Sequence, residues 1–275
     1  MNQPLFVPKN FHSISRRLKT ALRYGVAILQ RIENKKAYLN CMINDKPGII
    51  HLRNGLKIEI QGKRCIGFLN SIFFNKIYGT PKDEQVIIDI GANKGLFSVF
   101  FANELKGKEY KIFAFEPHPN TFQLLERNIK NNQLDKNILT FQKCVSGAST
   151  DTQSFFVARE SFDYSLYNEY QTNEKVVVEN ITLQEIIDQN SLTVIDLLKM
   201  NCEGAEYEIL FKTEKSYLKK IRAIRMEYHN FELDGKKYDL VPLIDYLEEN
   251  QFSIVNQLPY APEHGIIWFE NKKGA

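Results

Sequence analysis

The sequence has few cysteines, no long hydrophobic run and little net charge, and each shortage excludes a class of protein. No apolar run approaches the ~18 residues that a membrane-spanning helix needs. The net charge of +3 gives no reason to expect a nucleic-acid partner. The cysteines lie far apart and form no C-x-x-C pair, which argues against a disulfide scaffold or a zinc site and favours a reducing cytoplasm: Cys41, Cys65, Cys144 and Cys202.

The length of 275 residues, with 43% hydrophobic and 25% charged residues, suits one large domain or one domain with an appendage. We expect an N-terminal extension over residues 1–80 and the main domain over residues 81–275. Ser15 to about Ile32 shows helical periodicity with basic and no acidic residues, which predicts an amphipathic basic helix. This helix packs on the main domain or on a second subunit of a homodimer, contacts a membrane surface peripherally, or is a targeting peptide. Further on, "GIIHLRNGLKIEI" predicts a β-hairpin that turns at Asn54-Gly55.

From Pro81 onward, strand and helix patterns alternate, which predicts an α/β fold with a mostly parallel, doubly wound sheet. The predicted strands are Val86–Ile90, Lys111–Phe115, Ile138–Val145, Val194–Met200, Ala223–His229 and a last, antiparallel strand over "GIIWFEN". The predicted helices are Gly95–Leu105, a helix around Phe122–Ile129, "ITLQEIID", Ala205–Lys212 and Tyr238–Asn250. In such a sheet the ligand lies beyond the carboxyl ends of the strands, where this chain gathers its polar motifs.

The stretch "VIIDIGANKGLF" is a strand, a glycine turn and a helix start, which is typical of a nucleotide-cofactor site. A dinucleotide fingerprint needs glycines where the chain has Asn93 and Leu96, and no G-K-[ST] follows for a phosphate-binding loop. S-adenosylmethionine fits better. Its ammonium and carboxylate suit Asp89 and the amides of the turn, and its ribose hydroxyls suit the carboxylate of Glu116 after the second strand.

Four segments resemble the FkbM family of S-adenosylmethionine-dependent methyltransferases: "VIIDIGANKGLFSVFFA", "FAFEPHPNTFQLLERNI", "LLKMNCEGAEYEIL" and "IRMEYH". The resemblance implies a Rossmann-like class I methyltransferase fold and methyl transfer to a hydroxyl of a natural product, glycan or glycolipid. It departs at Asn201 and Gln184, where the family commonly has Asp. The expected cofactor-binding residues are Asp89, Gly91, Ala92, Asn93, Gly95, Phe97, Glu116, Pro117, Cys144, Val145 and Asn201.

Methyl transfer from a sulfonium is an in-line displacement, so the acceptor oxygen must be held close and sheltered from water. A general base helps because a protonated alcohol is a poor nucleophile. Glu203, Glu227 and His229 are the catalytic candidates, with Glu206 as a further carboxylate. Glu227 and His229 are two apart on one strand and therefore face the same side. Glu203 and Glu206 open a helix, where carboxylates also stabilise the dipole, and no metal is assigned.

The sequence thus predicts a cytoplasmic O-methyltransferase that acts on a hydroxyl, most simply of a sugar or glycan precursor. Nucleic acid is disfavoured, because the [ND]-P-P-[YF] turn of amine methylation and a Pro-Cys nucleophile are both absent from the sequence. Two alternatives stay open. One is a protein that binds S-adenosylmethionine but has lost catalysis, motivated by Asn201 and Gln184. The other is a nicotinamide-dependent oxidoreductase. Tyr164 and Tyr167 either line the acceptor site or cover the sheet edge.

Overall fold

The structure is a computed structural model that describes residues 25–273, except for 27, 158–163, 166–174, 234 and 262. The predicted basic helix from Ser15 lies outside the described residues apart from its end, where residues 28–31 are helical. Tyr167 and the side chain of Tyr164 also lie outside them. The expected roles of these segments stay predictions.

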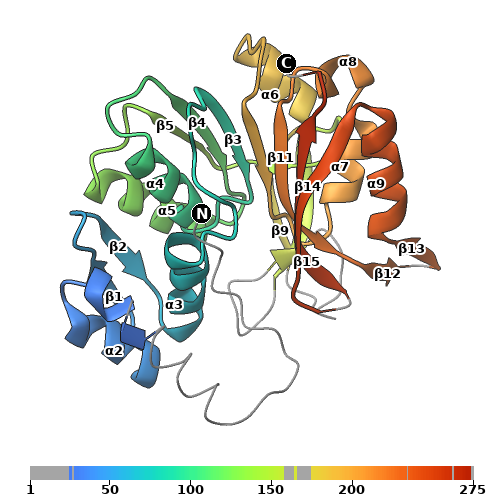
Figure 1. The fold of residues 1–275 in the computed structure, drawn as a ribbon. Helices are drawn as coiled ribbons and strands as arrows, with labels where there is room; N and C mark the ends of the chain where they lie inside the picture. Colours follow the sequence, from blue (N-terminus) through green and yellow to red (C-terminus); the bar gives the residue numbers. More distant parts are fainter. Residues whose placement is uncertain are drawn as a thin grey trace, which may run out of the picture.

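A seven-stranded sheet forms the centre of the protein, in the order β14-β15-β11-β10-β3-β4-β5 (Figure 1). The five strands from β11 to β5 are parallel, while β15 is antiparallel to both β11 and β14. This confirms the predicted mostly parallel sheet with an antiparallel C-terminal strand. The strand bounds are β3 Val86–Ile90, β4 Lys111–Phe115, β5 Ile138–Phe141, β10 Leu197–Met200, β11 Ala223–His229, β14 Phe252–Pro259 and β15 His264–Asn271.

Helices cover both faces of this sheet, and each face has its own hydrophobic core. Successive strand residues alternate between the cores: Ile87 belongs to the core of α4 and α5, and Ile88 to the core of α6, α7 and α9. The sheet is therefore doubly wound, as predicted. The helices are α4 Leu96–Glu104, α5 Pro119–Asn131, α6 Leu183–Gln189, α7 Glu206–Lys212, α8 Lys215–Leu218 and α9 Leu240–Glu249.

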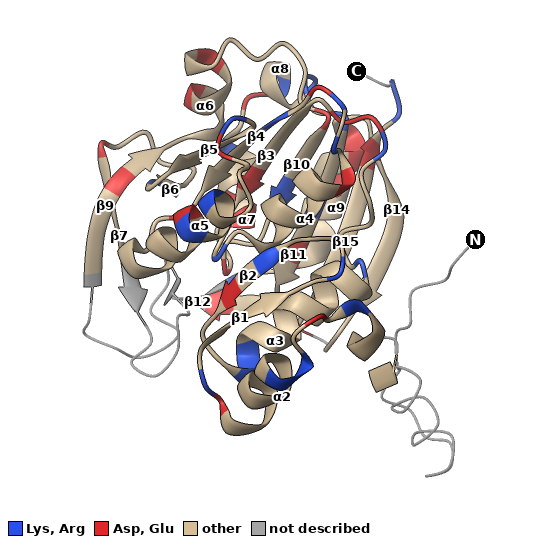
Figure 2. Cartoon of the chain, turned by 90° about the vertical axis from the view of Figure 1, so that its left-hand side faces the viewer, with Lys and Arg blue, Asp and Glu red and all other residues tan. Residues whose placement is uncertain are grey.

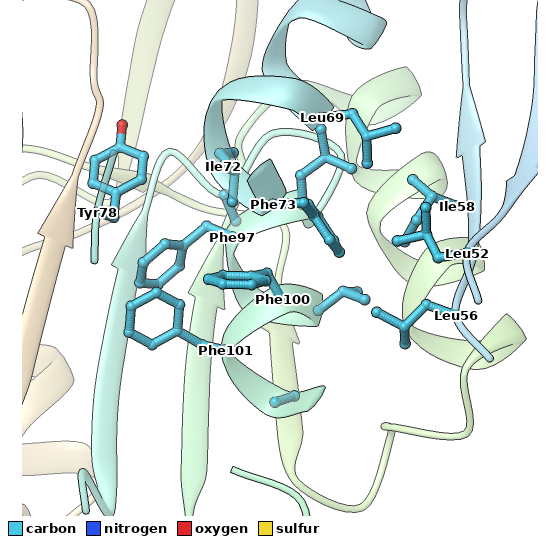
Figure 3. Close-up of a cluster of buried hydrophobic side chains, with 14 of the residues drawn as sticks. Leu52, Leu56, Ile58, Leu69, Ile72, Phe73, Tyr78, Phe97, Phe100 and Phe101 are labelled. Atoms are coloured by element: carbon cyan, nitrogen blue, oxygen red, sulfur yellow. The ribbon is translucent and has the colours of Figure 1, made fainter. Parts of the chain in front are cut away.

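The segment before the sheet folds against α4 and α5 and shares their core. It contains the predicted hairpin, in which Gly55 has a φ of 92°, and the elements α2 Lys35–Asn44, β1 Gly48–His51, β2 Lys57–Ile60, α3 Lys63–Leu69 and the π-helix η1 Asn70–Phe74. Figure 3 shows Ile72 and Phe73 over the aromatic face of α4, where the rings of Phe73 and Phe100 lie 5.1 Å apart. On α5, Asn128 accepts a hydrogen bond at 2.7 Å from the Glu59 amide of β2.

Several strands differ from the sequence prediction. The expected strand Ile138–Val145 is broken after Phe141, and Cys144–Val145 forms β6 of a separate sheet with β7 Thr152–Val157, β8 Tyr164–Ser165 and β9 Lys175–Ile181. Strand β14 and the hairpin of β12 Phe231–Leu233 and β13 Lys236–Tyr238 were not expected. Strand β14 lies at the sheet edge and only Phe252 in it is buried, so it lacks the buried apolar run that marks an inner strand.

Candidate active site

A cavity lies at the carboxyl ends of β3, β10 and β11, where the sequence places its polar motifs. Its wall includes part of the predicted cofactor set and two of the three catalytic candidates: Gly91, Ala92, Asn93, Phe97, Asn201, Glu203 and Glu227. Residues that the sequence analysis did not select complete it: Phe68, Ser71, Ile72, Ile77, Tyr78, Lys94, Leu96, Lys199 and Tyr260. Three strand ends and the segment after η1 thus converge on one site.

The glycine turn after β3 is built around left-handed backbone conformations. Gly91, Asn93 and Gly95 have φ values of 70°, 51° and 77°. A Cβ atom on Gly91 would lie 1.9 Å from the backbone oxygen of Asn201, so only glycine fits there. A Cβ atom on Gly95 would lie 2.6 Å from the Leu125 side chain of α5. Packing against backbone therefore requires glycine at position 91, whereas at position 95 the contact is the end of a flexible side chain and the left-handed φ favours glycine.

The amides of this turn donate hydrogen bonds within the protein. Ala92 donates to the carbonyl of Phe115 at 2.9 Å and Gly95 to that of Ala92 at 2.9 Å. Asn93 donates to the Glu116 carboxylate at 2.9 Å, and Lys94 donates to the Asn93 side chain at 2.9 Å. These four amides are therefore already bonded within the protein, and the expectation that the turn meets a cofactor carboxylate stays a prediction. Helix α4 begins next to them, and its first residues, Leu96 and Phe97, line the cavity with the unpaired amides of a helix start.

Asp89 is fully buried below the turn and is not part of the cavity wall. One carboxylate oxygen lies 2.9 Å from the ammonium of Lys199, and the other accepts a 2.6 Å hydrogen bond from the Ser98 hydroxyl. Lys199 also donates to the carbonyls of Gly91 at 2.8 Å and Ile90 at 3.3 Å. The cationic side chain thus stands between Asp89 and the cavity, and Asp89 does not present its carboxylate there.

The remaining predicted cofactor residues lie beside the cavity without lining it. Glu116 is buried and also accepts the amide of His118 at 2.9 Å. Pro117 follows it and is half-buried, and the buried pair Cys144 and Val145 comes from β6 of the smaller sheet. Burial, and after it the charge of Glu116, raises the pKa of the Cys144 thiol to about 12. The hydrogen bond from the Asn93 amide to the Glu116 carboxylate connects Glu116 to the cavity wall.

The catalytic candidates form one cluster at the end of β11. His229 Nε2 lies 3.6 Å from a carboxylate oxygen of Glu203, and its Nδ1 lies 3.6 Å from Glu206. Glu206 is fully buried and accepts the amides of Cys202 at 2.7 Å and Gly204 at 2.8 Å, so it holds the loop that carries Glu203. Glu203 itself has a φ of 52°. The structure thus brings all of the predicted carboxylates and His229 together.

The charges of this cluster are set by burial and by one another. Burial alone would lower the pKa of His229, but Glu206, Glu203 and Glu227 raise it to about 10. His229 is therefore protonated at neutral pH. Burial raises the pKa of Glu227 above its ordinary value, and the charge of His229 opposes that shift. Glu227 is thus the carboxylate whose proton affinity is tuned upward in the cavity wall.

A row of side chains across the sheet holds the segment with Ile77 and Tyr78, which lines the cavity and forms its roof. Asp89, Lys199, Arg225 and Trp268 occupy aligned positions on β3, β10, β11 and β15, so they share one face of the sheet. Arg225 stacks over the Trp268 ring at 4.7 Å and donates to the carbonyl of Tyr78. Trp268 Nε1 donates to the carbonyl of Ile77 at 3.1 Å. These bonds place Tyr78 over the cavity.

Sequence reasoning missed Lys199, Tyr78 and Tyr260. Lys199 did carry a signal, because a lysine inside a strand that is buried on both faces needs a partner. Tyr78 and Tyr260 lie in connecting segments without periodicity, and only tertiary contacts bring them to the site. Burial raises the pKa of both phenols, and Glu227 contributes to each shift.

Gln184, the other position that departs from the family pattern, lies outside this cavity. Its side chain accepts the Glu214 amide at 2.8 Å, between α6 and α8. In the part of the chain that the structure describes, no group of three or more His, Cys, Asp or Glu side chains is placed to hold a metal ion. No helix among the described residues is long and apolar enough to span a membrane.

Comparisons with known proteins agree with this geometry. The methyltransferase FkbM domain matches residues 89–254. Methyltransferase 1 of Beauveria bassiana is 26% identical over 216 residues, which cover 70% of this chain and 82% of that protein. The 31-O-demethyl-FK506 methyltransferase FkbM of Streptomyces tacrolimicus is 25% identical over 58% of this chain and 70% of its own length. The 2-O-methyltransferase NoeI of Sinorhizobium fredii is 27% identical over 68% of this chain and 79% of its own length.

Among solved structures, the methyltransferase FkbM from Methylobacillus flagellatus aligns with a TM-score of 0.50 at 16% identity, over 73% of this chain and 47% of that chain. At this identity the likeness concerns the fold alone. The sheet order and the cavity at the strand ends define a Rossmann-like class I methyltransferase fold. The domain match extends over more than half of the sequence, and the chain belongs to the FkbM methyltransferase family.

Proposed function

We propose that the protein transfers a methyl group from S-adenosylmethionine to a hydroxyl oxygen of a sugar, glycan or related natural product. The observation that carries this proposal is the carboxylate of Glu227 in the cavity wall, with its raised pKa and with Glu203 and Asn201 beside it. The names of two relatives state oxygen methylation, which supports the same reaction. The glycine turn, Lys199, Asn201, Glu203 and Glu227 lie in the family's matched region, whereas Tyr78 and Tyr260 of the same cavity lie outside it.

The residues of the site fit this cofactor. Asn201 Oδ1 is buried in the cavity wall without a hydrogen-bond partner, and it suits the ammonium of the amino-acid end. The start of α4 at Leu96 suits the carboxylate of that end, because helix N-termini bind anions. Glu116, which accepts the Asn93 amide, suits the ribose hydroxyls, and the Cys144 thiol lies close enough to feel its charge. The cofactor supplies an electrophilic methyl group on a sulfonium.

The side chains of the protein then supply position, proton transfer and shelter from water. Glu227 takes the proton of the acceptor hydroxyl, which contributes ~10²–10⁴-fold when the pKa of the base is near the working pH. Its raised pKa moves it in that direction. His229 is protonated at neutral pH, so it serves as the cationic partner of Glu203 and Glu206 and does not accept the proton. Tyr78 and Tyr260 close the site from above.

The alternative of a cofactor-binding protein without catalysis has less support. Gln184 lies outside the cavity and cannot weaken its chemistry directly. Asn201 does line the cavity, but an amide oxygen still accepts a hydrogen bond from an ammonium. The carboxylate side chains of Glu227, Glu203 and the buried Glu206 all lie in the cluster. The oxidoreductase alternative is set aside because the chain belongs to a methyltransferase family.

A binding experiment tests the cofactor. Calorimetry of the purified protein with S-adenosylmethionine and with NADH should show binding of the first ligand only. Glu116→Ala should weaken it ~10-fold or more, as loss of a charge-assisted pair predicts. Asp196→Ala is the matched control, because Asp196 also accepts two backbone amides, those of Gln85 and Val86, at the amino ends of β10 and β3, away from the cavity. Equal loss in both variants would show that Glu116 acts only on the fold.

A product experiment tests the reaction. The protein is incubated with S-adenosylmethionine and a panel of sugars and hydroxylated natural products, and S-adenosylhomocysteine release and product mass are measured. We expect O-methylated product and a large loss of turnover in Glu227→Gln with unchanged cofactor affinity. Product methylated on nitrogen alone, or no release with any acceptor, would remove the proposal.

A further inference from the structure

Lys199 is a buried charge in the middle of the sheet. Its residue is 3% exposed, between Leu198 and Met200, which are fully buried. Figure 2 shows a basic, blue part of β10 among the strands of the sheet. A buried ion pair is weak evidence for stability, since an apolar pair of similar size is often as stable. The placement of Lys199 therefore calls for a functional reason.

Only one partner of the ion pair between Lys199 and Asp89 faces the cavity. Lys199 lines the cavity, whereas Asp89 lies behind it and is fully enclosed. The ammonium also donates to the carbonyls of Gly91 and Ile90, which fixes it under the glycine turn. A ligand in the cavity is therefore nearer to the cation than to the anion, and Coulomb interactions weaken with distance.

The opposite part of the cavity wall is acidic. Glu227 and Glu203 come from the end of β11 and the loop after β10, and the unpaired acceptor Asn201 Oδ1 lies on the same wall. The start of α4, next to the turn above Lys199, adds the positive end of a helix dipole to the cationic part. The cavity is thus polarised, with positive charge under the turn and negative charge at the ends of β10 and β11.

We propose that Lys199 recognises the carboxylate of the amino-acid end of S-adenosylmethionine, and that Asp89 serves only to hold Lys199 in place. This inference rests on the proposed function and reverses the expected role of Asp89. The ammonium of the same amino-acid end then faces Asn201 and the acidic wall. A zwitterionic end thus fits the cavity in one orientation.

The test compares S-adenosylmethionine with decarboxylated S-adenosylmethionine, which keeps the ammonium and the sulfonium but lacks the carboxylate. Calorimetry gives the Kd of each ligand for the wild type, for Lys199→Arg and for the double variant Lys199→Met with Asp89→Asn. The double variant removes both charges together, so no unpaired charge stays buried. Lys108→Met is the matched control, because Lys108 makes a 2.9 Å ion pair with Asp83 on the surface.

We expect the wild type and Lys108→Met to prefer S-adenosylmethionine about tenfold or more, because the Lys199 ammonium, whose N–H groups already donate to Asp89, Gly91 and Ile90, attracts the carboxylate through its charge. The double variant should lose that preference while its affinity for the decarboxylated ligand stays within twofold, and Lys199→Arg should keep part of it. Equal weakening of both ligands, or an unchanged preference, would overturn the role of Lys199. A wild type that binds neither ligand would instead refute the proposed function, and this inference with it.

Discussion

Replacement of Gly91 by alanine tests the packing of the two loops that form the active site. The alanine would adopt a φ of 70°, and its Cβ would lie 1.9 Å from the Asn201 oxygen. The left-handed conformation costs about 1–2 kcal/mol, and overpacking adds roughly 1–3 kcal/mol or more. The contacting atom belongs to the backbone of the loop that carries Glu203, so it cannot move aside as the end of a side chain can.

Gly107→Ala is a matched control for this variant. Gly107 has a φ of 87°, and a Cβ atom there would have no other atom within 4 Å, so only the conformational cost applies. For a chain of this size, 1 kcal/mol corresponds to roughly 2–4 °C in Tm. We expect Gly107→Ala to lower Tm by about 2–8 °C and Gly91→Ala by clearly more.

The assay is thermal unfolding followed by circular dichroism, with calorimetric titration of S-adenosylmethionine at a temperature where both variants are folded. Gly91→Ala should also lose cofactor affinity, because Asn201 and the turn must separate, whereas Gly107→Ala should retain it. Equal shifts of Tm for the two variants would refute the reasoning. Retained affinity in a folded Gly91→Ala protein would show that the loops separate without disturbing the site.

Three further predictions concern the cluster and the roof of the cavity. Glu227→Gln should reduce kcat ~10²-fold or more with an accepted hydroxyl substrate and leave the Kd of S-adenosylmethionine unchanged; loss of binding would contradict its role as base. The folded pKa of His229 is raised from 6.5 to about 10, so its charge stabilises the protein fully below pH 6.5 and the stabilisation is lost as the pH rises through about 10. His229→Gln should therefore lower Tm most at low pH, and a pH-independent difference would contradict this. Trp268→Phe should cost about 0.5–1.5 kcal/mol in denaturant unfolding, because the carbonyl of Ile77 loses its donor; unchanged stability would argue against the roof anchor.

The central strands could be predicted from the sequence because their burial follows a regular local pattern, which is continuous in Val86–Ile90 and Lys111–Phe115 and alternating in Ala223–His229. Val86–Ile90, Lys111–Phe115 and Ala223–His229 were predicted with the bounds that the structure shows. Strand β14 shows no such burial pattern, because it lies at the sheet edge and only Phe252 in it is buried. The break after Phe141 was also hidden, because Cys144 and Val145 are as apolar and buried as a continuing strand would be.

The residues of the candidate site that follow strand ends could be predicted from the order of strands and helices. Those that reach the cavity through tertiary contacts could not. Strand ends converge in any parallel sheet, so Gly91, Asn201 and Glu227 could be gathered from topology alone. Tyr78 reaches the cavity only because Arg225 and Trp268, far along the chain, hold its backbone. A sequence reading has no local signal for such a contact.

At the glycine turn, the close approach that requires glycine differs from the one that the sequence suggested. From the sequence, Gly91 suggests a backbone that a cofactor approaches closely. In the structure the close approach is made by the Asn201 carbonyl, and the amides of the turn are already bonded. The groups next to the turn are then the ones available to a ligand. They are the start of α4, the Asn201 side-chain oxygen without a hydrogen-bond partner and the charge of Lys199. A glycine signature therefore identifies a place where two backbones meet, and the side chains around that meeting point decide which ligand it binds.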